Sequence, residues 1–444
     1  MAKKYDPQSE RLFKKDVPKM PEGYYSGDKP NPNLRAFVEQ HLRERPYDPE
    51  TDDYDVPAFD KPIETTKATA IYNMHTYWSK KPHDAIRQYI RHYTQPGDLV
   101  LDPFCGSGGT ALAALMEGRK AIAIDRSPAA TFITKNYCTP VDIDELQRAF
   151  EELKRKVKPE IDWLYETRCD RCGGKATTAY TVYSQVFQCP RCLEKVPLFD
   201  CVKVEGMTEK GKPKKIRACP YCHKRGIVEE ISTRAERFGA VPVLVDYICE
   251  NGCRPARSER RYNDQDKRKR ECFEMYDMGK IREIEAKQVP HWYPKDRMMN
   301  APVNDIRWAL LWRPYHGSIT RVCDFFTHRN LWAIAAYFNA VSNMKVEIPV
   351  FRDILYGILT AIMYGLSKMN QYRPDVSFPL NYSANTLYVP PIGSEQALWK
   401  HAENKFNKVI AGYSSINQEY DRNCSPKVII STGDARNLED IASN

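Results

Sequence analysis

The stretch "VLDPFCGSGGTALAALMEGRKAIAIDRSP", which runs from Val100 to Pro128, decides the fold of the chain. It begins with a short apolar segment that contains an acid, passes through a glycine-rich turn from Cys105 to Thr110, and enters an apolar helix. A second apolar segment follows and ends in another acid, Asp125. Strand, glycine turn, helix, strand and acid form the mononucleotide-binding half of an open α/β sheet, whose ligands lie at the carboxyl ends of the strands. The stretch therefore predicts a small-molecule site at this turn.

Three kinds of ligand could use such a turn. A phosphate loop needs G-x-x-x-x-G-K-[ST], and no lysine follows Gly109. A dinucleotide fingerprint needs G-x-G-x-x-G; Gly106 and Gly108 match it, but Ala111 stands in the third position. S-adenosylmethionine carries no phosphate and needs a close backbone approach at the two glycines, where a β-carbon would collide with it. It also needs a carboxylate for the ribose hydroxyls, which Asp125 supplies, so the residues favour this cofactor over a turn that merely connects strand and helix.

The residues just upstream resemble a known family. The segment "HTYWSKKPHDAIRQYIRHYTQPGDLVLDPFCGSGGT" (75–110) is similar to the DNA amino-methyltransferases, which methylate the exocyclic amine of adenine or cytosine. In that family a helix that opens with Lys-Pro and a P-G-D turn lead into VLDPFxGSGTT. The matching residues are Lys81 and Pro82, Pro96 to Asp98, and Val100 to Thr110. Gly109 stands where the family usually has Thr, and the resemblance covers residues 75–128.

The resemblance also implies which residues surround S-adenosylmethionine. Asp125 would bind the ribose. A third strand, "KVIISTGDA" (427–435), would place Asp434 beside the adenine ring, where it can accept from the cofactor's amine. The remaining residues expected against the cofactor are Lys81, Asp102, Pro103, Phe104, Cys105, Gly106, Gly108 and Arg126.

The family's catalytic tetrapeptide, [DNS]-P-P-[YFW], does not occur in residues 1–444. The nearest string, "YVPPI" (388–392), has Val389 where the target amine needs an acceptor and Ile392 where the extruded base needs an aromatic ring. We therefore expect no catalytic residue in this chain and no activity of the chain by itself. Three strands of a larger sheet would leave an unpaired edge, which natural proteins avoid. A missing C-terminal part or a second chain is expected to complete the sheet.

Four pairs of cysteines predict two metal sites. The pairs are Cys169 and Cys172, Cys189 and Cys192, Cys219 and Cys222, and Cys249 and Cys253. Two C-x-x-C pairs 15–20 residues apart are typical of a zinc ribbon. The first two pairs are 16 residues apart and fit this pattern, so they are assigned one zinc ion. The last two pairs are 26 residues apart, and Cys249 and Cys253 are one residue further apart than in C-x-x-C; they are assigned a second ion. Cys201, Cys272 and His223 are alternative ligands of the second ion. Closed four-cysteine sites are structural, so two Zn²⁺ ions are expected to fold the module.

The cysteine-rich segment also carries most of the net charge. Residues 201–270 hold 18 Lys and Arg against 10 Asp and Glu, which accounts for +8 of the chain's +9. The basic runs are "KGKPKKIR" (210–217) and "RSERRYNDQDKRKR" (257–270). A basic patch on a small rigid module favours a polyanion, and the expected partner is DNA ahead of RNA. The alternative is a solvated loop whose charge is partly offset by anionic zinc–thiolate clusters.

The composition is that of a globular protein. The 444 residues are 42% hydrophobic and 28% charged, which suits two or three domains. No segment near the N-terminus is apolar enough to predict a signal peptide. The most apolar stretch, 354–367, has 14 residues, which predicts a buried core helix and no membrane partner. A cytoplasmic protein with metal-binding rather than disulfide-bonded cysteines is expected.

The expected fold class is α/β: a Rossmann-like methyltransferase sheet, incomplete in this chain, with an inserted zinc-ribbon module and a mostly helical domain. The expected parts are an extended N-terminal arm (1–68), the first part of the cofactor-binding core (69–165), two basic zinc-ribbon modules (166–275), an aromatic-rich, mostly helical domain that is a candidate for target recognition (276–420), and the third strand of the core (421–444).

Aromatic residues are concentrated in the stretch 307–338. They could stack on an extruded base, but core packing is favoured because large aromatics dominate burial. The residues concerned are Trp308, Trp312, Tyr315, Phe325, Phe326 and Trp332.

The sequence favours one function over another. The favoured function is a site-specific DNA methyltransferase of restriction-modification or phage defence, which transfers a methyl group from S-adenosylmethionine to the exocyclic amine of adenine or cytosine. The alternative is a zinc-dependent nucleic-acid-binding subunit whose methyltransferase half is vestigial or split.

Overall fold

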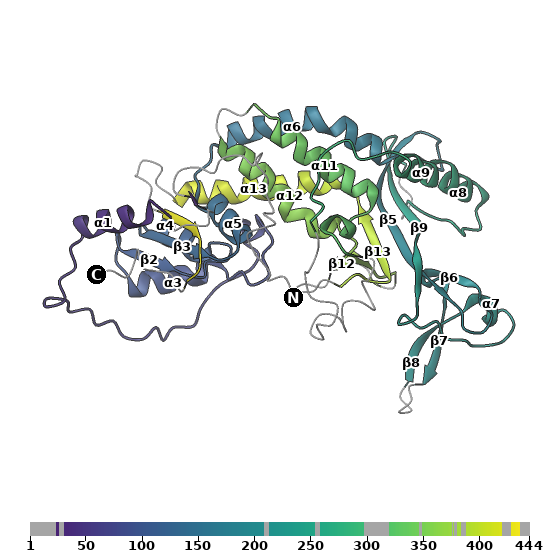
Figure 1. Cartoon of the computed structure of the whole chain (residues 1–444), viewed down its shortest axis with the longest axis horizontal. Coiled ribbons are helices and arrows are strands. Elements are labelled where there is room, and N and C mark those ends of the chain that lie inside the picture. The colour runs from purple at the N-terminus through teal and green to yellow at the C-terminus, as the bar shows by residue number, and fades with distance from the viewer. Residues whose placement is uncertain are drawn as a thin grey trace, which may run out of the picture. The chain divides into compact units, whose positions relative to one another are not determined.

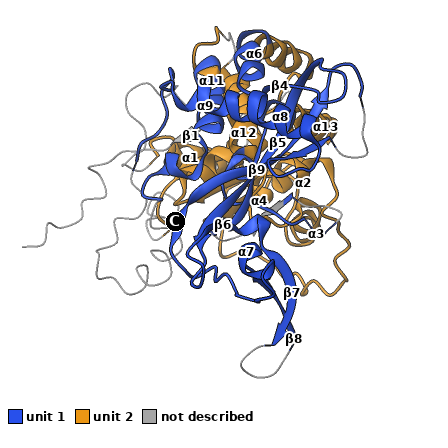
Figure 2. Cartoon of the chain, turned by 90° about the vertical axis from the view of Figure 1, so that its right-hand side faces the viewer, with its two compact units in different colours: residues 1–12, 155–340, 363–401 blue, residues 13–154, 341–362, 402–444 orange. Residues whose placement is uncertain are grey.

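The computed structural model describes residues 24–25, 31–207, 213–253, 258–296, 319–345, 349–374, 376, 380–382, 388–419 and 428–435. The chain forms two compact units (Figure 2). Unit 1 lies within residues 155–340 and 363–401, and unit 2 within residues 13–154, 341–362 and 402–444. The segment 276–420, expected as one helical domain, is thus divided between the two units.

A parallel sheet forms the centre of unit 2 (Figure 1). Its strands, in spatial order, are β1 (Tyr24–Tyr25), β14 (Val428–Thr432), β3 (Lys120–Asp125) and β2 (Leu99–Asp102). All neighbours are parallel, and the three strands predicted from sequence are confirmed. Ala121 to Ile124 of β3 are buried, as expected for a central parallel strand covered on both faces. Mixed α/β architecture is therefore confirmed.

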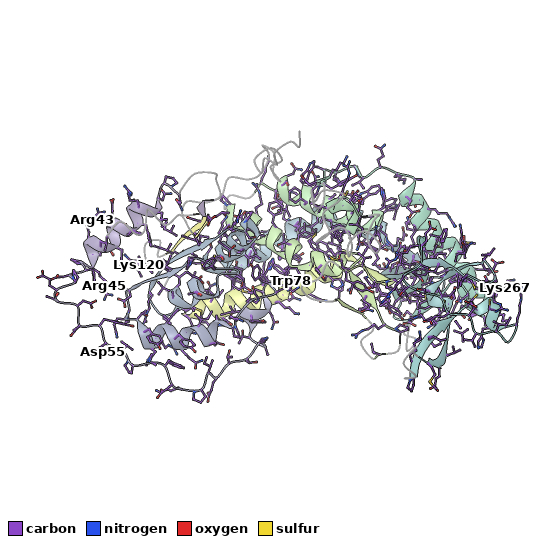
Figure 3. All side chains as sticks on the ribbon, turned by 60° about the horizontal axis from the view of Figure 1, so that its bottom comes forward. Arg43, Arg45, Asp55, Trp78, Lys120 and Lys267 are labelled. Atoms are coloured by element: carbon purple, nitrogen blue, oxygen red, sulfur yellow. The ribbon has the colours of Figure 1, made fainter. Side chains whose placement is uncertain are left out.

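Helices cover this sheet. Helix α1 (Leu34–Glu44) buries Leu34 against Ile122 and Ile429, so part of the expected N-terminal arm is packed on the sheet. Its end is fixed by two ion pairs, Arg45 with Asp98 and Glu44 with Lys120; Arg45 and Lys120 are labelled in Figure 3. The remaining helices in this part are α2 (Ala70–Asn73), α3 (His83–Tyr93), α4 (Gly109–Met116) and α5 (Pro128–Cys138).

Four long helices follow later in the chain: α6 (Ile143–Leu164), α11 (His328–Ser342), α12 (Pro349–Leu366) and α13 (Leu398–Glu419). The period of three and four predicted α6 correctly, and Phe150 on its buried stripe stacks on Phe406 at 3.9 Å between ring centroids. By length and composition α12 could cross a membrane, yet 56% of it is buried in the protein. The helix is 18 residues long, which is four residues longer than the apolar stretch 354–367 singled out in the sequence. Its buried Asp353 forms an ion pair with Lys135.

Unit 1 is built on a long antiparallel ladder. The path through its sheet runs β10 (Glu259–Arg261), β9 (Arg237–Cys249), β5 (Lys175–Gln188), β13 (Ile392–Gln396), β11 (Asn370–Tyr372) and β12 (Leu380–Tyr382). Strands β4 (Glu166–Arg168) and β6 (Lys195–Pro197) also pair with β5. Strands β11, β12 and β13, which lie in the segment expected as a mostly helical domain, thus extend the sheet that carries the cysteine pairs.

Short elements complete unit 1. They are the hairpin β7 (Val202–Met207) and β8 (Pro213–Ala218), the helices α7 (Pro220–His223), α8 (Lys267–Cys272) and α9 (Gly279–Glu285), the 3₁₀ turns η1 (Leu198–Asp200) and η3 (Val322–Phe325), and the π-helical turn η2 (Phe273–Met278).

Candidate cofactor and metal sites

Asp125 holds the glycine turn against the end of β3. The backbone N–H of Gly106 donates to Oδ2 of Asp125 at 2.9 Å, and the N–H of Ser127 donates to Oδ1 at 2.8 Å. The N–H of Cys105 donates to the carbonyl of Ile124 at 2.9 Å. One carboxylate therefore fixes both the turn and the first residues of the loop that enters α5.

Two further acids lie at the same edge of the sheet. Asp102 ends β2, and its Oδ1 accepts from the N–H of Phe104 at 3.1 Å. The N–H of Gly433 donates to the carbonyl of Asp125 at 3.0 Å, which places Asp434 at the end of the adjacent strand. A carboxylate has about four acceptor sites, so Asp102 and Asp125 keep acceptor capacity for a ligand's hydroxyl or amine groups. Such a set of acids suits a cofactor that is cationic and rich in donors, and it does not suit a phosphate.

Both glycines of the turn adopt left-handed backbone, with φ of +53° at Gly106 and +79° at Gly108. A β-carbon on Gly108 would lie 2.7 Å from Cγ2 and 2.8 Å from Cα of Thr134, in α5. A β-carbon on Gly106 would lie 3.2 Å from the ring of Tyr77. From the sequence, the need for glycine at both positions was attributed to a close approach of the cofactor. At Gly108 the packing of the turn on the chain's own helix already requires glycine.

The other predicted cofactor residues differ in exposure. Phe104 is 77% exposed, and Lys81 and Arg126 are also exposed. Pro103 is half-buried beside them. Cys105 is 5% exposed, and burial raises the pKa of its thiol to about 12, so the thiol stays protonated at neutral pH.

The lysine that precedes Lys81 has a structural role. Nζ of Lys80 donates to the carbonyls of Tyr72 and His75, the latter at 2.7 Å, and to the hydroxyl of Tyr137 at 3.3 Å. Burial and the neighbouring charge of Lys405 lower the pKa of Lys80 to about 8. Its donors tie the segment before α3 to α5.

Sequence reasoning missed two residues that shape the turn. The hydroxyl of Thr134 donates to the carbonyl of Gly106 at 3.1 Å, and Tyr77 covers Gly106 from the other side. Burial, and then the charge of Asp125, raise the pKa of Tyr77, so its hydroxyl stays neutral. Only the position of Tyr77, within the segment that resembles the methyltransferases, could have singled it out.

The N-terminal third of the chain matches a family of known activity. Residues 2–136 match the DNA methylase family. The resemblance inferred from residues 75–128 is therefore confirmed, and the matched residues include the glycine turn and Asp125.

Several type II methyltransferases and a putative methylase are similar to parts of the chain. Type II methyltransferase M.MjaII of Methanocaldococcus jannaschii is 28% identical over 106 residues, 24% of this chain and 20% of the relative. Type II methyltransferase M.BsoBI of Geobacillus stearothermophilus is 32% identical over 93 residues, which are 20% of this chain and 18% of the relative. Putative methylase YubD of Escherichia coli is 45% identical over 47 residues, which are 11% of this chain and 21% of the relative. The chain spans about a fifth of the length of these relatives. No solved structure matches significantly.

The cysteines gather into two clusters, but the predicted assignment of pairs was wrong. One cluster, the outer cluster, joins the first and last pairs: Cys169, Cys172, Cys249 and Cys253. The inner cluster joins the two middle pairs: Cys189, Cys192, Cys219 and Cys222. Cys201, Cys272 and His223, the alternative ligands, belong to neither cluster. The eight predicted ligands are thus brought together in a nested order.

The ladder of β5 and β9 explains the nesting. The 16 residues between the first two pairs form no hairpin; 14 of them are the single strand β5, which in extended form measures about 45 Å. Strand β9 returns antiparallel, with Cys249 opposite Ala176 and Arg237 opposite Phe187. The outer cluster therefore joins the pair before β5 to the pair at the end of β9. In the inner cluster, the pair that follows β5 meets Cys219 and Cys222, which lie at α7, upstream of β9. The spacing rule assumes a turn between pairs, and β5 contains neither Gly nor Pro.

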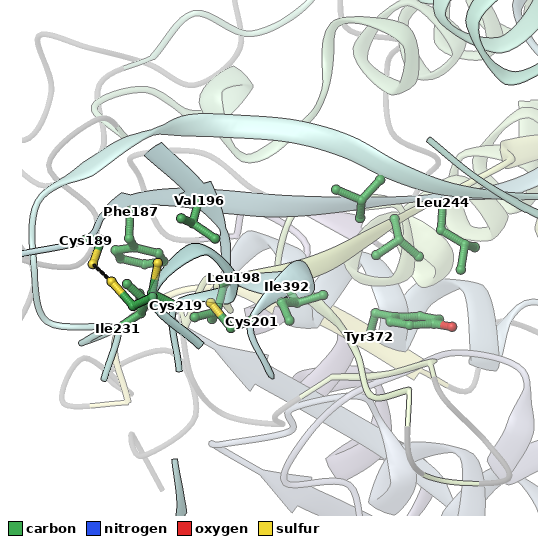
Figure 4. Packing of buried hydrophobic residues seen from close by; sticks show 13 residues of the cluster. Phe187, Cys189, Val196, Leu198, Cys201, Cys219, Ile231, Leu244, Tyr372 and Ile392 are labelled. Atoms are coloured by element: carbon green, nitrogen blue, oxygen red, sulfur yellow. Dashed lines mark hydrogen bonds between the residues drawn. The ribbon is translucent and has the colours of Figure 1, made fainter. Parts of the chain in front are cut away.

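Both clusters fit a tetrahedral metal ion. Within each cluster the four Sγ atoms lie within 4.8 Å of one another. Sγ–Sγ separations are 3.6 Å for Cys172 and Cys249, and 3.7 Å for Cys189 and Cys222. Four sulfurs at 2.3 Å from a tetrahedral zinc would lie about 3.8 Å apart. The inner cluster also forms part of a core with Phe187 (Figure 4).

The described aromatics of the stretch 307–338 belong to the core or its margin. Phe325 and Trp332 are buried, and the ring N–H of Trp332 donates to Glu160 at 2.7 Å. Phe326 packs against the same core as Phe325. Three of the residues considered for base stacking, Trp308, Trp312 and Tyr315, lie outside the described residues.

Gly108→Ala tests the packing of the turn, with Gly118→Ala as its control. Gly118 has φ +73° but no atom within 4 Å of its would-be β-carbon, so the control should cost only about 1–2 kcal/mol of unfolding free energy. Gly108→Ala should cost about 1–3 kcal/mol more, because its β-carbon overlaps Thr134. Denaturant unfolding measures both, and equal losses would contradict the packing argument.

Two double variants test the nested pairing of cysteines. If each cluster holds one ion, Cys169→Ser with Cys249→Ser should remove one metal equivalent, because both residues lie in the outer cluster. Cys169→Ser with Cys189→Ser should remove both equivalents, because it damages both clusters. The metal content of purified protein is measured by mass spectrometry. If the pairs met in sequence order instead, the first double variant would remove both equivalents and the second only one.

Proposed function

We propose that the chain is the cofactor-binding part of a DNA amino-methyltransferase of a restriction-modification or defence system, built on a Rossmann-like sheet. The observation that supports it is the arrangement of Asp102, Asp125 and Asp434 at the ends of three adjacent parallel strands, around the turn of the stretch that matches the DNA methylases. The donor would be S-adenosylmethionine and the acceptor the exocyclic amine of adenine or cytosine.

The chain's own residues would bind and orient this cofactor. When bound, S-adenosylmethionine supplies an electrophilic methyl group. Asp125 would accept from the ribose hydroxyls with the acceptor sites that its two backbone contacts leave open. Asp434 would accept from the adenine amine, and the exposed ring of Phe104 would cover the ligand from solvent. The acids also favour a cationic ligand.

The hairpin of β7 and β8 supports DNA as the partner. Figure 1 shows it extending beyond β6 and α7. Lys203 lies directly opposite Arg217 across the two strands, and exposed Lys215 lies on the same face. Glu205 lies opposite Lys215 on this face, which thus carries three cations and one acid, and this excess of positive charge suits an anionic partner. A two-stranded ribbon fits the major groove of B-DNA.

Part of the basic sequence is not available to DNA. Arg260, in the run 257–270, is fully buried and its Nη2 donates to Oδ1 of Asp277 at 2.7 Å. The guanidinium also stacks over the ring of Tyr247. The proposed DNA contacts are therefore assigned to the β7–β8 hairpin rather than to the whole basic composition of residues 201–270.

Asp125→Asn tests the cofactor site. Loss of one charge-assisted hydrogen bond costs about 1.5–3 kcal/mol, so the affinity for S-adenosylmethionine should fall about 10- to 100-fold in a calorimetric titration. Asp142→Asn is the matched control, because Oδ1 of Asp142 also accepts from a backbone N–H, that of Glu145, at 3.0 Å. Binding is measured rather than turnover because residues 1–444 contain no [DNS]-P-P-[YFW]. Equal losses in the two variants would count against the site.

Lys203→Gln with Lys215→Gln tests the DNA surface. If each lysine neutralises one phosphate, the slope of log K against log salt for duplex DNA should become shallower by roughly 0.9 for each phosphate that is no longer neutralised. Lys61→Gln with Lys67→Gln, two exposed lysines of unit 2, should leave the slope unchanged. Fluorescence anisotropy over a salt series measures both. An unchanged slope in the hairpin variant would remove the hairpin from the DNA site. A chain that binds DNA but no S-adenosylmethionine would favour the alternative of a nucleic-acid-binding subunit.

A further inference from the structure

Unit 1 contains a cavity of about 280 Å³ to which the methyltransferase site assigns no role. Its wall joins two sequence motifs that the proposed function does not use. Thr327 to Arg329 enter α11 from the "FFTHRN" segment, and Val389 and Pro390 belong to the "YVPPI" string. Residues of β5, β13 and α9 complete the wall.

A buried ion pair fixes the polar side of the cavity. Nε of Arg329 donates to Oε1 of Glu395 at 3.1 Å, and Nη2 donates to Oε2 of the same carboxylate. The hydroxyl of Thr327 also donates to Oε1, at 2.5 Å. Burial by itself would lower the pKa of Arg329, but the charge of Glu395 raises it, so the guanidinium stays protonated.

The charges around the cavity balance. Besides the Arg329–Glu395 pair, the wall contains one cation, Lys368, and one acid, Glu285. Such a cavity has no excess of positive charge for a phosphate. Its apolar part includes Ile281, Ile284 and Val389, each less than 10% exposed. A neutral ligand with a flat apolar face and a polar edge suits this wall.

Two side chains at the wall have hydrogen-bonding capacity that the described residues do not use. The side-chain amide of Gln185 has no partner in the described part of the chain. Nη1 of Arg329 makes no hydrogen bond there either. The hydroxyl of Ser394 is buried without a partner, but Ser394 lies opposite Val182 of the core and therefore on the other face of β13 from Glu395. A ligand in the cavity could therefore bond to the amide and to the guanidinium.

We propose that this cavity binds a single nucleobase projecting from the substrate nucleic acid. A base has an apolar face for the aliphatic wall and an edge of adjacent donors and acceptors for the amide and the guanidinium. Glutamine and arginine are the side chains that read adenine and guanine edges. The cavity is a recognition pocket: its lining lies in unit 1, whereas the cofactor candidates lie in unit 2.

This inference rests on the proposed nucleic-acid substrate, but it is tested independently of methyl transfer and of S-adenosylmethionine. The probes are nine-nucleotide DNA chains that carry one base on an otherwise abasic backbone, one chain for each of the four bases, and a fully abasic chain. Because the phosphates are identical, any difference in affinity reports the base. The full chain should bind at least one of the four about fivefold or more tightly than the abasic chain.

Gln185→Met should weaken that preference, because it keeps the length of the side chain and removes the amide, while binding of the abasic chain stays unchanged. Gln188→Met, at an exposed glutamine of the same strand, is the matched control and should keep the preference. Ala240→Met is the second variant: Ala240 lies opposite Gln185 at the wall, so the longer side chain should weaken the preference by occupying the cavity. Equal affinity of the unmodified protein for all five chains would overturn the inference. So would an unchanged preference in both variants when they are folded. Cofactor binding and salt-dependent DNA binding would then still stand.

Discussion

The carboxylate of Asp125 is the constraint on which the candidate cofactor site depends. It accepts one backbone N–H from the glycine turn and one from Ser127, while the backbone carbonyl of the same residue accepts from Gly433. The glycine turn and the end of β14, which are distant in sequence, therefore converge on one residue at the end of β3. The pairing of β2 and β14 with β3 brings the other two acids to the same edge of the sheet. The same carboxylate keeps acceptor sites for a ligand, so the group that organises the edge is also the group proposed to bind ribose.

A second constraint governs unit 1. The antiparallel ladder of β5 and β9 is long enough to separate two cysteine clusters, and the two cysteine pairs that flank β5 belong to different clusters. The ladder also extends through β13, the strand that carries Ser394 and Glu395. Cysteine clusters, recognition pocket and basic hairpin are therefore attached to one continuous sheet and to the turns at its ends. If metal ions bind, they would stabilise both ends of the strands on which the proposed base pocket is formed.

Local sequence signals predicted the elements around the cofactor site well. Apolar runs ending in acids gave β2, β3 and β14, and the period of three and four gave α6. The structural need for glycine at position 108 was not predictable from the sequence. A β-carbon there would overlap Thr134, which lies 26 positions later and which no local pattern connects to the turn. Likewise, the position of Arg260 in a basic run predicts a surface charge. Its burial and its pairing with Asp277 show that it is a core residue.

The sequence by itself determined the identity of the stretch 75–128, the parallel strands with their terminal acids, and the eight cysteines that gather into clusters. These follow from local chemistry: the residue types, their spacing and their period are written in consecutive positions. The tertiary structure alone decided which cysteine pairs meet, and that "FFTHRN" and "YVPPI" line one cavity. Both depend on strand partners, because an antiparallel return brings the last residues of one strand to the first of another, and spacing along the chain carries no record of that return.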